Sequence, residues 1–337
     1  MMKDMEGVFM SKEEHSIRRK IRFEKYKKIS LSLMLVFFFP YMVAVCLQGI
    51  HGKCEQKQNV YWEPYFLGVL AKECPKESEL EFLKAQAVLI RTRLYQQMDK
   101  EQEFQYVEAY LRPEEMAEKW RGLDYDHQYE MYKKAMTDTE GEVLTYGADY
   151  AWVPYHKSSN GKTRSALEVL KVEYPYLTAK ECPKDEQAIE EYQTGIYEYE
   201  EVQTQCSLYL QAVGEEEVEQ VFCEGDYEIL SYDSSGYVNE LRIGKSCITG
   251  EQFRDALHLP SSCFTLRDVN GKLQITTTGR GHGIGMSQWT ANEMAKEGKN
   301  YQEILNYFFE GAELKKGCII HFQSGNDIVR GDENEEE

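Results

Sequence analysis

The chain has 337 residues, of which 42% are hydrophobic and 29% charged, and its formal net charge is −19. This length suits one or two domains with a substantial core, and the hydrophobic content excludes a disordered or collagen-like chain. A protein this acidic repels nucleic acid, so we expect no DNA or RNA partner.

The first 50 residues differ in charge from the rest of the chain. Residues 1–28 carry a net charge of +4, residues 29–50 contain no charged side chain, and residues 51–337 carry −23. The uncharged stretch of 22 residues is long enough to cross about 30 Å of hydrocarbon as a helix. The basic residues before it predict a cytoplasmic N-terminus and an extracytoplasmic remainder.

A cleaved signal peptide is the alternative interpretation of the same stretch. The apolar run exceeds the roughly 7–15 residues of a typical signal, and no cleavage site is obvious after it. We therefore predict a single-pass protein of the cell membrane, anchored by a transmembrane helix over residues 29–50.

The chain has nine cysteines, one of which, Cys46, lies in the predicted span. The other eight could form a disulfide framework, but their gaps are wide and none makes a C-x-x-C pair. A zinc ribbon or a thioredoxin-type site is therefore not expected, and scattered free cysteines are an equal alternative to disulfides.

The outer part of the chain has mixed helix and strand patterns, which predict the α+β class. We divide it into a polar linker over 51–60, a domain over 61–325 and a solvated acidic tail over 326–337. Apolar residues at helical spacing predict a first helix over 61–71. Ser78, followed three residues later by Glu81, predicts a capping box at the start of a second.

The second helix has apolar residues at three- and four-residue steps, which predict a buried stripe. The charged residues 96–145 are interpreted as a mostly helical insertion, and the acid-rich residues 181–226 as a solvated face or a partner surface. Further patterns predict a loop over 155–163, strands over 234–244 and 272–278, and helices over 287–297 and 301–309.

The most unusual segment is the glycine-rich stretch from Gly279 to Gln288. Four glycines alternate with larger residues between a predicted strand and a predicted helix. Such a loop can bring bare backbone close to a ligand, or it can be a tight structural connection. The dinucleotide, P-loop and esterase motifs all fail here, because the residues that they require are absent.

Glu73 lies between two apolar helical stretches, a setting that can desolvate a carboxyl group, as general acids require. Pattern alone does not select it, because the chain has 58 acidic residues and most of them are expected at the surface. A resemblance to a known family does select it.

Two blocks of the sequence resemble the stage II sporulation protein D family. The first is Gly68–Pro75 with Leu83–Val88 and Arg91-Thr92, and the second is the glycine-rich stretch Gly279–Gln288. Segments around 241–257 and 301–308 also fit, in the same order. The chain departs from the family pattern at Arg93 and at Trp289, where the family usually has tyrosine.

The resemblance implies a membrane-anchored lytic transglycosylase, a glycan-strand lyase that cuts peptide-free peptidoglycan during engulfment of the forespore. The catalytic glutamate of the family corresponds to Glu73. It would act as general acid to the glycosidic oxygen and then as base toward the C6 hydroxyl, leaving a 1,6-anhydro-N-acetylmuramic acid end. One carboxyl group suffices for this reaction, because no water is consumed.

Five further residues are inferred to bind substrate from their positions in or near the motifs: His282, Gln288, Arg91, His156 and Ser158. The resemblance implies no cofactor. Some members have a zinc site near the central loop, but this chain has no cysteine between Cys74 and Cys182, so we predict no metal. The implied partners are peptidoglycan strands, a cell-wall amidase and a membrane scaffold of the engulfment machinery.

A different function remains open, because related proteins with this domain enhance a wall amidase instead of cutting glycan. The departures at Arg93 and Trp289 keep this alternative open.

Overall fold

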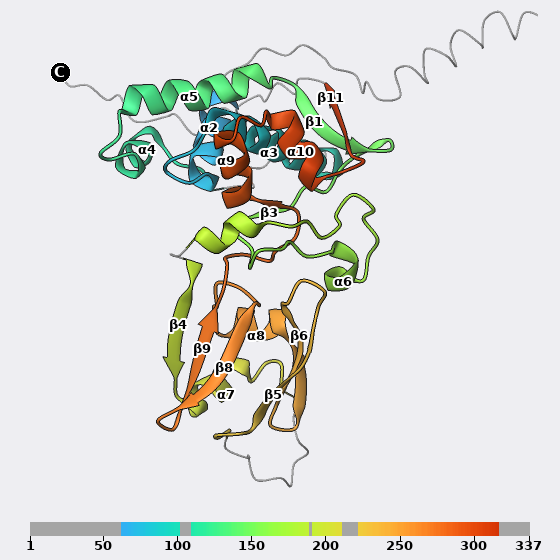
Figure 1. The fold of residues 1–337 in the computed structure, drawn as a ribbon. Coiled ribbons are helices and arrows are strands. Elements are labelled where there is room, and N and C mark those ends of the chain that lie inside the picture. The colour runs from blue at the N-terminus through green and yellow to red at the C-terminus, as the bar shows by residue number, and fades with distance from the viewer. Residues whose placement is uncertain (1–61, 102–108, 189–190, 211–221, 317–337) are drawn as a thin grey trace, which may run out of the picture. The chain divides into compact units, whose positions relative to one another are not determined.

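The structure is a computed structural model, and all its described residues belong to the part of the chain that begins at residue 56 (Figure 1). It describes residues 62–101, 109–188, 191–210 and 222–316. The predicted cytoplasmic segment, transmembrane helix, linker and acidic tail lie outside these residues. Among the described helices, none is both long and apolar enough to cross a membrane.

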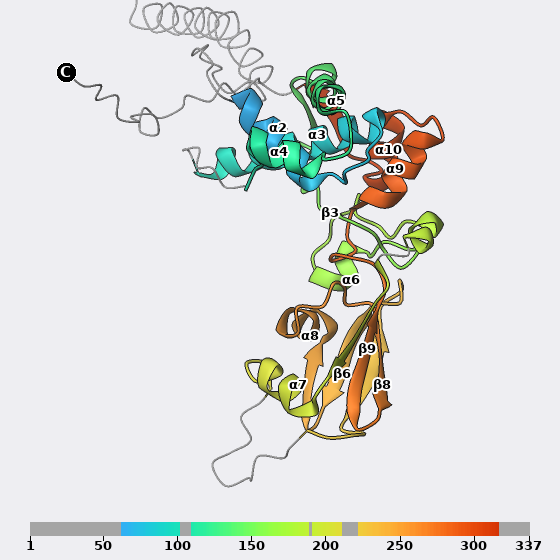
Figure 2. The same ribbon diagram turned by 90° about the vertical axis from the view of Figure 1, so that its left-hand side faces the viewer.

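The first helices pack around α3 (Leu80–Glu101), which is buried on nearly every side over residues 82–95. Its apolar side chains are fully buried well beyond the predicted stripe, as expected of a helix at the centre of a core. Its neighbours include α2 (Trp62–Glu73), α5 (Tyr125–Asp138), α9 (Gln288–Lys296) and α10 (Tyr301–Phe308). Figures 1 and 2 show α9 and α10, which come from the end of the chain, beside α3.

The charged segment 96–145 is only partly the helical insertion that we predicted. It contains α4 (Pro113–Lys119) and α5, but it ends in the strand β1 (Glu142–Tyr146). Strand β1 is central in a three-stranded antiparallel sheet, between β2 (Asp149–Tyr150) and β11 (Glu313–Lys316). The far end of the described chain thus returns to this core.

The predicted capping box at Ser78 does not form. Helix α3 begins at Leu80, so the residue directly before the helix is Glu79 and not Ser78. The Ser78 hydroxyl donates to the carbonyl of Pro75, and the Asn292 side chain of α9 accepts the amide of Glu79. Glu81 instead accepts the backbone N–H of Tyr301, at the start of α10. Contacts with distant residues have replaced the local cap.

A second core lies between two three-stranded antiparallel sheets and the helices α7 (Tyr199–Cys206) and α8 (Gly250–Ala256). One sheet has the order β4-β9-β8 and the other β5-β6-β7. Their bounds are β4 Gln193–Tyr197, β5 Tyr227–Tyr232, β6 Val238–Ile243, β7 Ser246–Thr249, β8 Phe264–Val269 and β9 Lys272–Thr277. The predicted strands over 234–244 and 272–278 correspond to β6 and β9.

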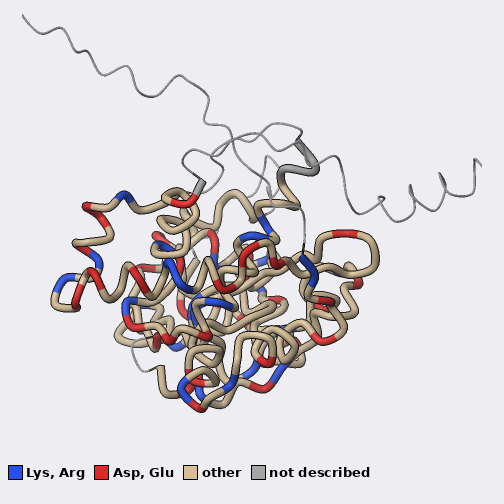
Figure 3. Tube along the Cα trace, turned by 90° about the horizontal axis from the view of Figure 1, so that it is seen from above, with Lys and Arg blue, Asp and Glu red and all other residues tan. Residues whose placement is uncertain are grey.

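The acid-rich segment 181–226 is not simply a solvated face. It contributes Cys182, Val202, Cys206 and Phe222 to the two cores, and it buries one carboxylate, Asp185. The six cysteines that the structure describes are all free thiols. Lys/Arg and Asp/Glu are interspersed over the described chain without separating into two regions (Figure 3).

Short elements join the helical core to the second core. They are β3 (Tyr155–His156), α6 (Ala166–Leu170), the 3-10 helix η1 (Pro183–Gln187) and β10 (Met286–Ser287). Strand β10 pairs with β3 in parallel, so that Met286 lies opposite Tyr155 and Ser287 opposite His156. This pairing joins the glycine-rich stretch to the predicted loop 155–163, whose first two residues form β3 and not a loop.

Candidate functional site

Glu73 is the last residue of α2, and its side chain is half-buried. The helix ends here because the next residues turn away at Pro75, which cannot continue a helix. The residues on either side of Glu73 along the chain differ: Cys74 is buried, whereas Lys72 is exposed. The predicted catalytic carboxyl group therefore lies where the helical core meets the surface.

The end of α2 is held by Lys119, the last residue of α4. Its ammonium group donates to the carbonyl oxygens of Ala71, Lys72 and Cys74, at 2.5, 3.1 and 2.6 Å. Burial lowers the pKa of Lys119, while the charge of Glu73 acts in the opposite direction. An ammonium group at a helix C-terminus is favourable, because it satisfies carbonyls that lack partners in the helix.

Gln288 connects Glu73 to the glycine-rich stretch. The Gln288 side chain is almost fully buried and donates both to the carbonyl of Glu73, at 3.1 Å, and to Oε1 of Gln86, at 3.2 Å. Its hydrogen bonds therefore go to the protein itself, and they bring the two sequence blocks of the resemblance together. Gln288 is the one predicted binding residue that contacts Glu73 through a hydrogen bond in the described structure.

The glycines of the stretch allow its backbone to lie directly on the segment 154–164. At Gly281, with φ at +113°, a Cβ atom would lie 2.6 Å from Cβ of His156. At Gly285, with φ at +75°, it would lie 2.0 Å from the carbonyl oxygen of Pro154. Close packing between two chain segments accounts for these glycines without a ligand.

His156 and His282 lie beside each other in this packed region, with ring centroids 5.9 Å apart. His156 is buried, and its Nδ1 is 3.2 Å from the carbonyl oxygen of Ile284, so we place the proton on Nδ1. His282 uses its Nδ1 as acceptor for the N–H of Ile284, which leaves the proton on Nε2. Burial lowers the pKa of His156 to about 4 and that of His282 to about 3, so both rings are neutral near pH 7.

Two polar atoms near this pair have no hydrogen-bond partner among the described residues: Nε2 of His156 and Oγ of Ser158. Both side chains are more than nine-tenths buried. His282 is less buried than either of them. The predicted binding residues His156, His282 and Ser158 thus lie together, in the segment that adjoins β10.

Arg91 lies apart from these histidines, in the helical core. Its guanidinium donates to the carbonyls of Met136 and Glu142 and to the hydroxyl of Thr139. The ring of Phe66 is 5.1 Å away, and burial lowers the pKa of Arg91 to about 10. These contacts join α3 to the end of α5 and the start of β1.

Asp185 is a buried carboxylate that sequence analysis did not select. One oxygen accepts the backbone N–H and the hydroxyl of Ser159, each at 2.6 Å. The other accepts the hydroxyl of Ser287 at 2.8 Å and both the N–H and the hydroxyl of Thr290, at 3.1 and 2.6 Å. Asp185 thus holds the start of α9 against the loop after β3, on either side of Gln288.

Arg164 makes a similar connection toward the second core. Its side chain is buried and forms ion pairs with Asp233, at 2.6 Å, and with Glu251. It also donates to the carbonyl of His282, at 3.3 Å, and its guanidinium lies 4.6 Å from the ring centroid of Tyr237. A charge this deeply buried is stable only when paired, as it is here.

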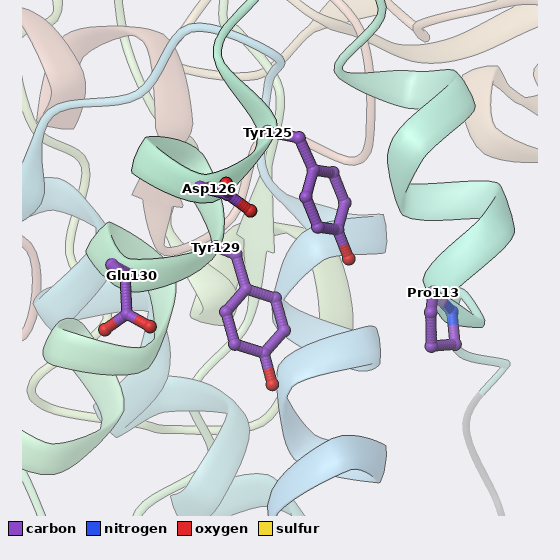
Figure 4. Close-up of a pocket in the computed structure, with 5 residues that line it drawn as sticks. All are labelled: Pro113, Tyr125, Asp126, Tyr129 and Glu130. Atoms are coloured by element: carbon purple, nitrogen blue, oxygen red, sulfur yellow. The ribbon is translucent and has the colours of Figure 1, made fainter.

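A surface pocket of about 440 Å³ lies on the helical core, away from these residues. It is lined by Pro113, Tyr125, Asp126, Tyr129 and Glu130, and its two tyrosine rings are stacked with centroids 6.1 Å apart (Figure 4). None of the predicted site residues lines it. In the part of the chain that the structure describes, no group of three or more His, Cys, Asp or Glu side chains is arranged to hold a metal ion.

The arrangement around Glu73 suits proton transfer by a single carboxyl group. Its backbone is held by Gln288, its helix end is held by Lys119, and its side chain is accessible to solvent in part. Groups that sequence reasoning missed, Lys119 and Asp185, hold this region through contacts between residues far apart in the chain, 48 positions for Lys119 with Ala71 and 102 for Asp185 with Ser287.

Comparison with known proteins identifies similar chains. Residues 51–146 match a family described as SpoIID, Stage II sporulation protein. The chain is 29% identical to Stage II sporulation protein D of Bacillus amyloliquefaciens, over 77% of this chain and 75% of that protein. It is 28% identical to Stage II sporulation protein D of Bacillus subtilis (strain 168), over 77% and 76%.

A further relative carries a different name. The protein called Amidase enhancer of Bacillus subtilis (strain 168) is 25% identical over 73% of this chain, and the match spans 40% of that protein.

Proposed function

This chain belongs to the stage II sporulation protein D family, a family of sporulation proteins, and from that premise we propose that it is a lytic transglycosylase. Its substrate would be the peptide-free glycan strand of peptidoglycan, cleaved during engulfment of the forespore. The observation that carries the proposal is the hydrogen bond from Gln288 to the backbone of Glu73, which joins the two motif blocks at one half-buried carboxyl group.

The proposed reaction has two proton transfers, both at Glu73. The protonated carboxyl group first gives its proton to the glycosidic oxygen as the bond to C1 of N-acetylmuramic acid breaks. The carboxylate then takes the proton from the C6 hydroxyl of the same sugar, and this oxygen attacks C1 to close the 1,6-anhydro ring. The carboxyl group is regenerated, and neither water nor a second carboxylate is needed.

Lys119 and Gln288 would support this reaction without touching the substrate. They hold the backbone on both sides of the Glu73 side chain, so the carboxyl group keeps one position through both transfers. His282, His156, Ser158 and Arg91 remain predicted binding residues. Of these, His282 is the one whose side chain is only half-buried, which favours it for contact with a sugar.

The location of the protein is also a proposal. Residues 29–50 would cross the cell membrane once, with the N-terminus in the cytoplasm and the domain that contains Glu73 outside. Peptidoglycan lies on that side of the membrane, so the proposed topology would bring the carboxyl group to its substrate.

A second candidate function is enhancement of a cell-wall amidase without glycan cleavage. The relative named Amidase enhancer favours it, because its match covers 73% of this chain. In that case the chain would bind the amidase or its substrate, and Glu73 would have no role in proton transfer.

Digestion of peptide-free glycan strands tests the two functions against each other. The full chain in detergent and its Glu73→Gln variant are incubated with the strands, and the new ends are identified by mass spectrometry. Anhydro-muramic ends that appear with the wild type and are lost in the variant would support the transglycosylase. If neither protein makes new ends but both accelerate an added wall amidase, the enhancer function is supported instead.

A further inference from the structure

Lys157 and Trp289 form an exposed pair close to Glu73. Lys157 directly follows β3, and Trp289 directly follows Gln288 in the first turn of α9. The backbone N–H of Trp289 donates to the carbonyl of Lys157 at 3.0 Å, which extends the parallel pairing of β3 with β10. The two residues are therefore held side by side by backbone contacts.

This pair differs from its surroundings in exposure. Gln288, Ser287 and Thr290 are buried, whereas 36% of Trp289 is exposed and Lys157 is exposed as well. A large exposed aromatic residue within an otherwise buried helix turn is unusual, because burial of its ring would stabilise the fold.

The Lys157 ammonium group also has no carboxylate partner among the residues that the structure describes, whereas other lysines of this region are paired. Lys162, for example, lies 3.1 Å from Glu181, and Lys184 pairs with Glu297. The position of Lys157 relative to Glu73 follows from two consecutive residues of α9. The side chain of Gln288 donates to the carbonyl of Glu73, and the backbone N–H of Trp289 donates to the carbonyl of Lys157, so both groups are near the end of α2.

We propose that Lys157 and Trp289 form a subsite for a sugar that carries a free carboxylate, next to the carboxyl group of Glu73. The ring of Trp289 would stack on the apolar face of the sugar, and Lys157 would pair with the carboxylate. This inference rests on the proposed function and adds to it the residues that recognise the substrate. N-acetylmuramic acid exposes its lactyl carboxylate only when the stem peptide is absent, so the pair would select peptide-free strands.

The subsite would also explain how a strongly acidic protein binds an anionic sugar. The chain is strongly acidic, yet the proposed substrate is an anion, and the two would repel each other at long range. A local pair of cations, Lys157 and Lys119, would offset that repulsion at the point where the sugar is bound. Because the ammonium group of Lys119 already donates hydrogen bonds to three carbonyls, Lys157 is the one of the two cations that can contact a ligand.

Binding to uncleaved strands tests the inference separately from the chemistry. The full chain with Glu73→Gln, in detergent, is titrated with peptide-free strands and with the same strands after their lactyl carboxylates are converted to amides. We expect about 3- to 10-fold tighter binding of the free carboxylate, a difference that salt weakens because the pair is exposed. Adding Lys157→Met should abolish the preference, and adding Lys157→Arg should keep it.

The matched control is Lys296→Met, since Lys296 is an exposed lysine on the same helix that pairs with Glu293. It should leave the preference unchanged. Trp289→Ala should weaken binding of both strands by about 10-fold, whereas Trp289→Tyr should keep most of it.

The outcomes separate the inference from the function on which it rests. A Lys157→Met protein that still prefers the free carboxylate overturns the inference, and so does equal binding of the two strands by the parent protein. Cleavage by the wild type would leave the proposed function intact in either case. A carboxylate preference that depends on Lys157, in a wild-type chain that cuts no glycan, would support the subsite and reject the transglycosylase.

Discussion

Replacing Asp185 by asparagine tests whether one buried carboxylate holds the region around Gln288. Asparagine has the same shape, but one of its two terminal groups is a donor. If the amide nitrogen faces Ser159, the backbone N–H of that residue, now 2.6 Å from a carboxylate oxygen, loses its acceptor. If the amide nitrogen faces Thr290 instead, the backbone N–H of Thr290 keeps only the Ser287 hydroxyl, at 3.3 Å, as its acceptor.

The magnitude follows from these contacts. A buried N–H without a partner costs about 1–3 kcal/mol, and the remaining hydrogen bonds become weaker when the acceptor loses its charge. The neutral amide costs less to bury than the carboxylate, which offsets part of this loss. We therefore expect Asp185→Asn to lower the free energy of unfolding by about 2 kcal/mol, since the hydroxyl groups can rotate to new partners.

Urea denaturation of the full chain in detergent measures this change, with Glu186→Gln as the control. Glu186 is the next residue and is exposed, so its substitution should change stability by less than about 0.5 kcal/mol. Cleavage of glycan should fall in Asp185→Asn more than stability alone explains, because Gln288 and Glu73 lose their fixed position. An Asp185→Asn protein as stable as Glu186→Gln would refute the role assigned to this carboxylate.

Three further predictions concern the same region. Lys119→Met leaves three carbonyls at the end of α2 without their ammonium partner, so we expect about 2 kcal/mol lower stability and reduced cleavage, with Lys119→Arg intermediate in both assays. Gly285→Ala should destabilise the protein by at least about 2 kcal/mol more than Gly298→Ala, because both have positive φ but only at Gly285 would the new Cβ lie 2.0 Å from a backbone oxygen; equal unfolding midpoints would contradict this. His156 has its pKa lowered from 6.5 to about 4, so the unfolded chain binds more protons between these values, and stability present above pH 6.5 is lost toward pH 4. His156→Asn, which can keep the hydrogen bond to Ile284, should reduce this slope by about 1.4 kcal/mol per pH unit, and an unchanged slope in urea titrations would show that the ring is not buried neutral.

Local patterns predicted the elements that local interactions determine. Helices α9 and α10 lie where apolar spacing and the following Gly298 and Gly311 indicated them, and β9 follows its alternating residues. The capping box at Ser78 failed because its Glu81 side chain accepts the N–H of Tyr301, and Asn292 accepts the N–H of Glu79 just before the helix, both from more than 200 positions away. A local pattern contains no information about such a partner.

In the candidate site too, some residues could be predicted from the sequence, whereas others depend on contacts between distant segments. The resemblance selected Glu73 and Gln288, and the structure joins them through a hydrogen bond. Pattern could not find Asp185, because its five hydrogen bonds come from two distant segments of the chain, at Ser159 and at the start of α9, and its neighbours Lys184 and Glu186 are ordinary charged residues. Lys119 was missed for a similar reason, since an α4 lysine is expected to be solvated until α2 is placed beside it.

The central claim is that Glu73 cleaves glycan without using water. Digestion of peptide-free strands by the full chain in water enriched with oxygen-18 tests it directly, because a hydrolase adds one labelled oxygen to each new end. We predict new muramic ends that lack a water molecule and contain no label, and no new ends from Glu73→Gln. Labelled reducing ends, or unlabelled anhydro ends made equally well by Glu73→Gln, would contradict the account.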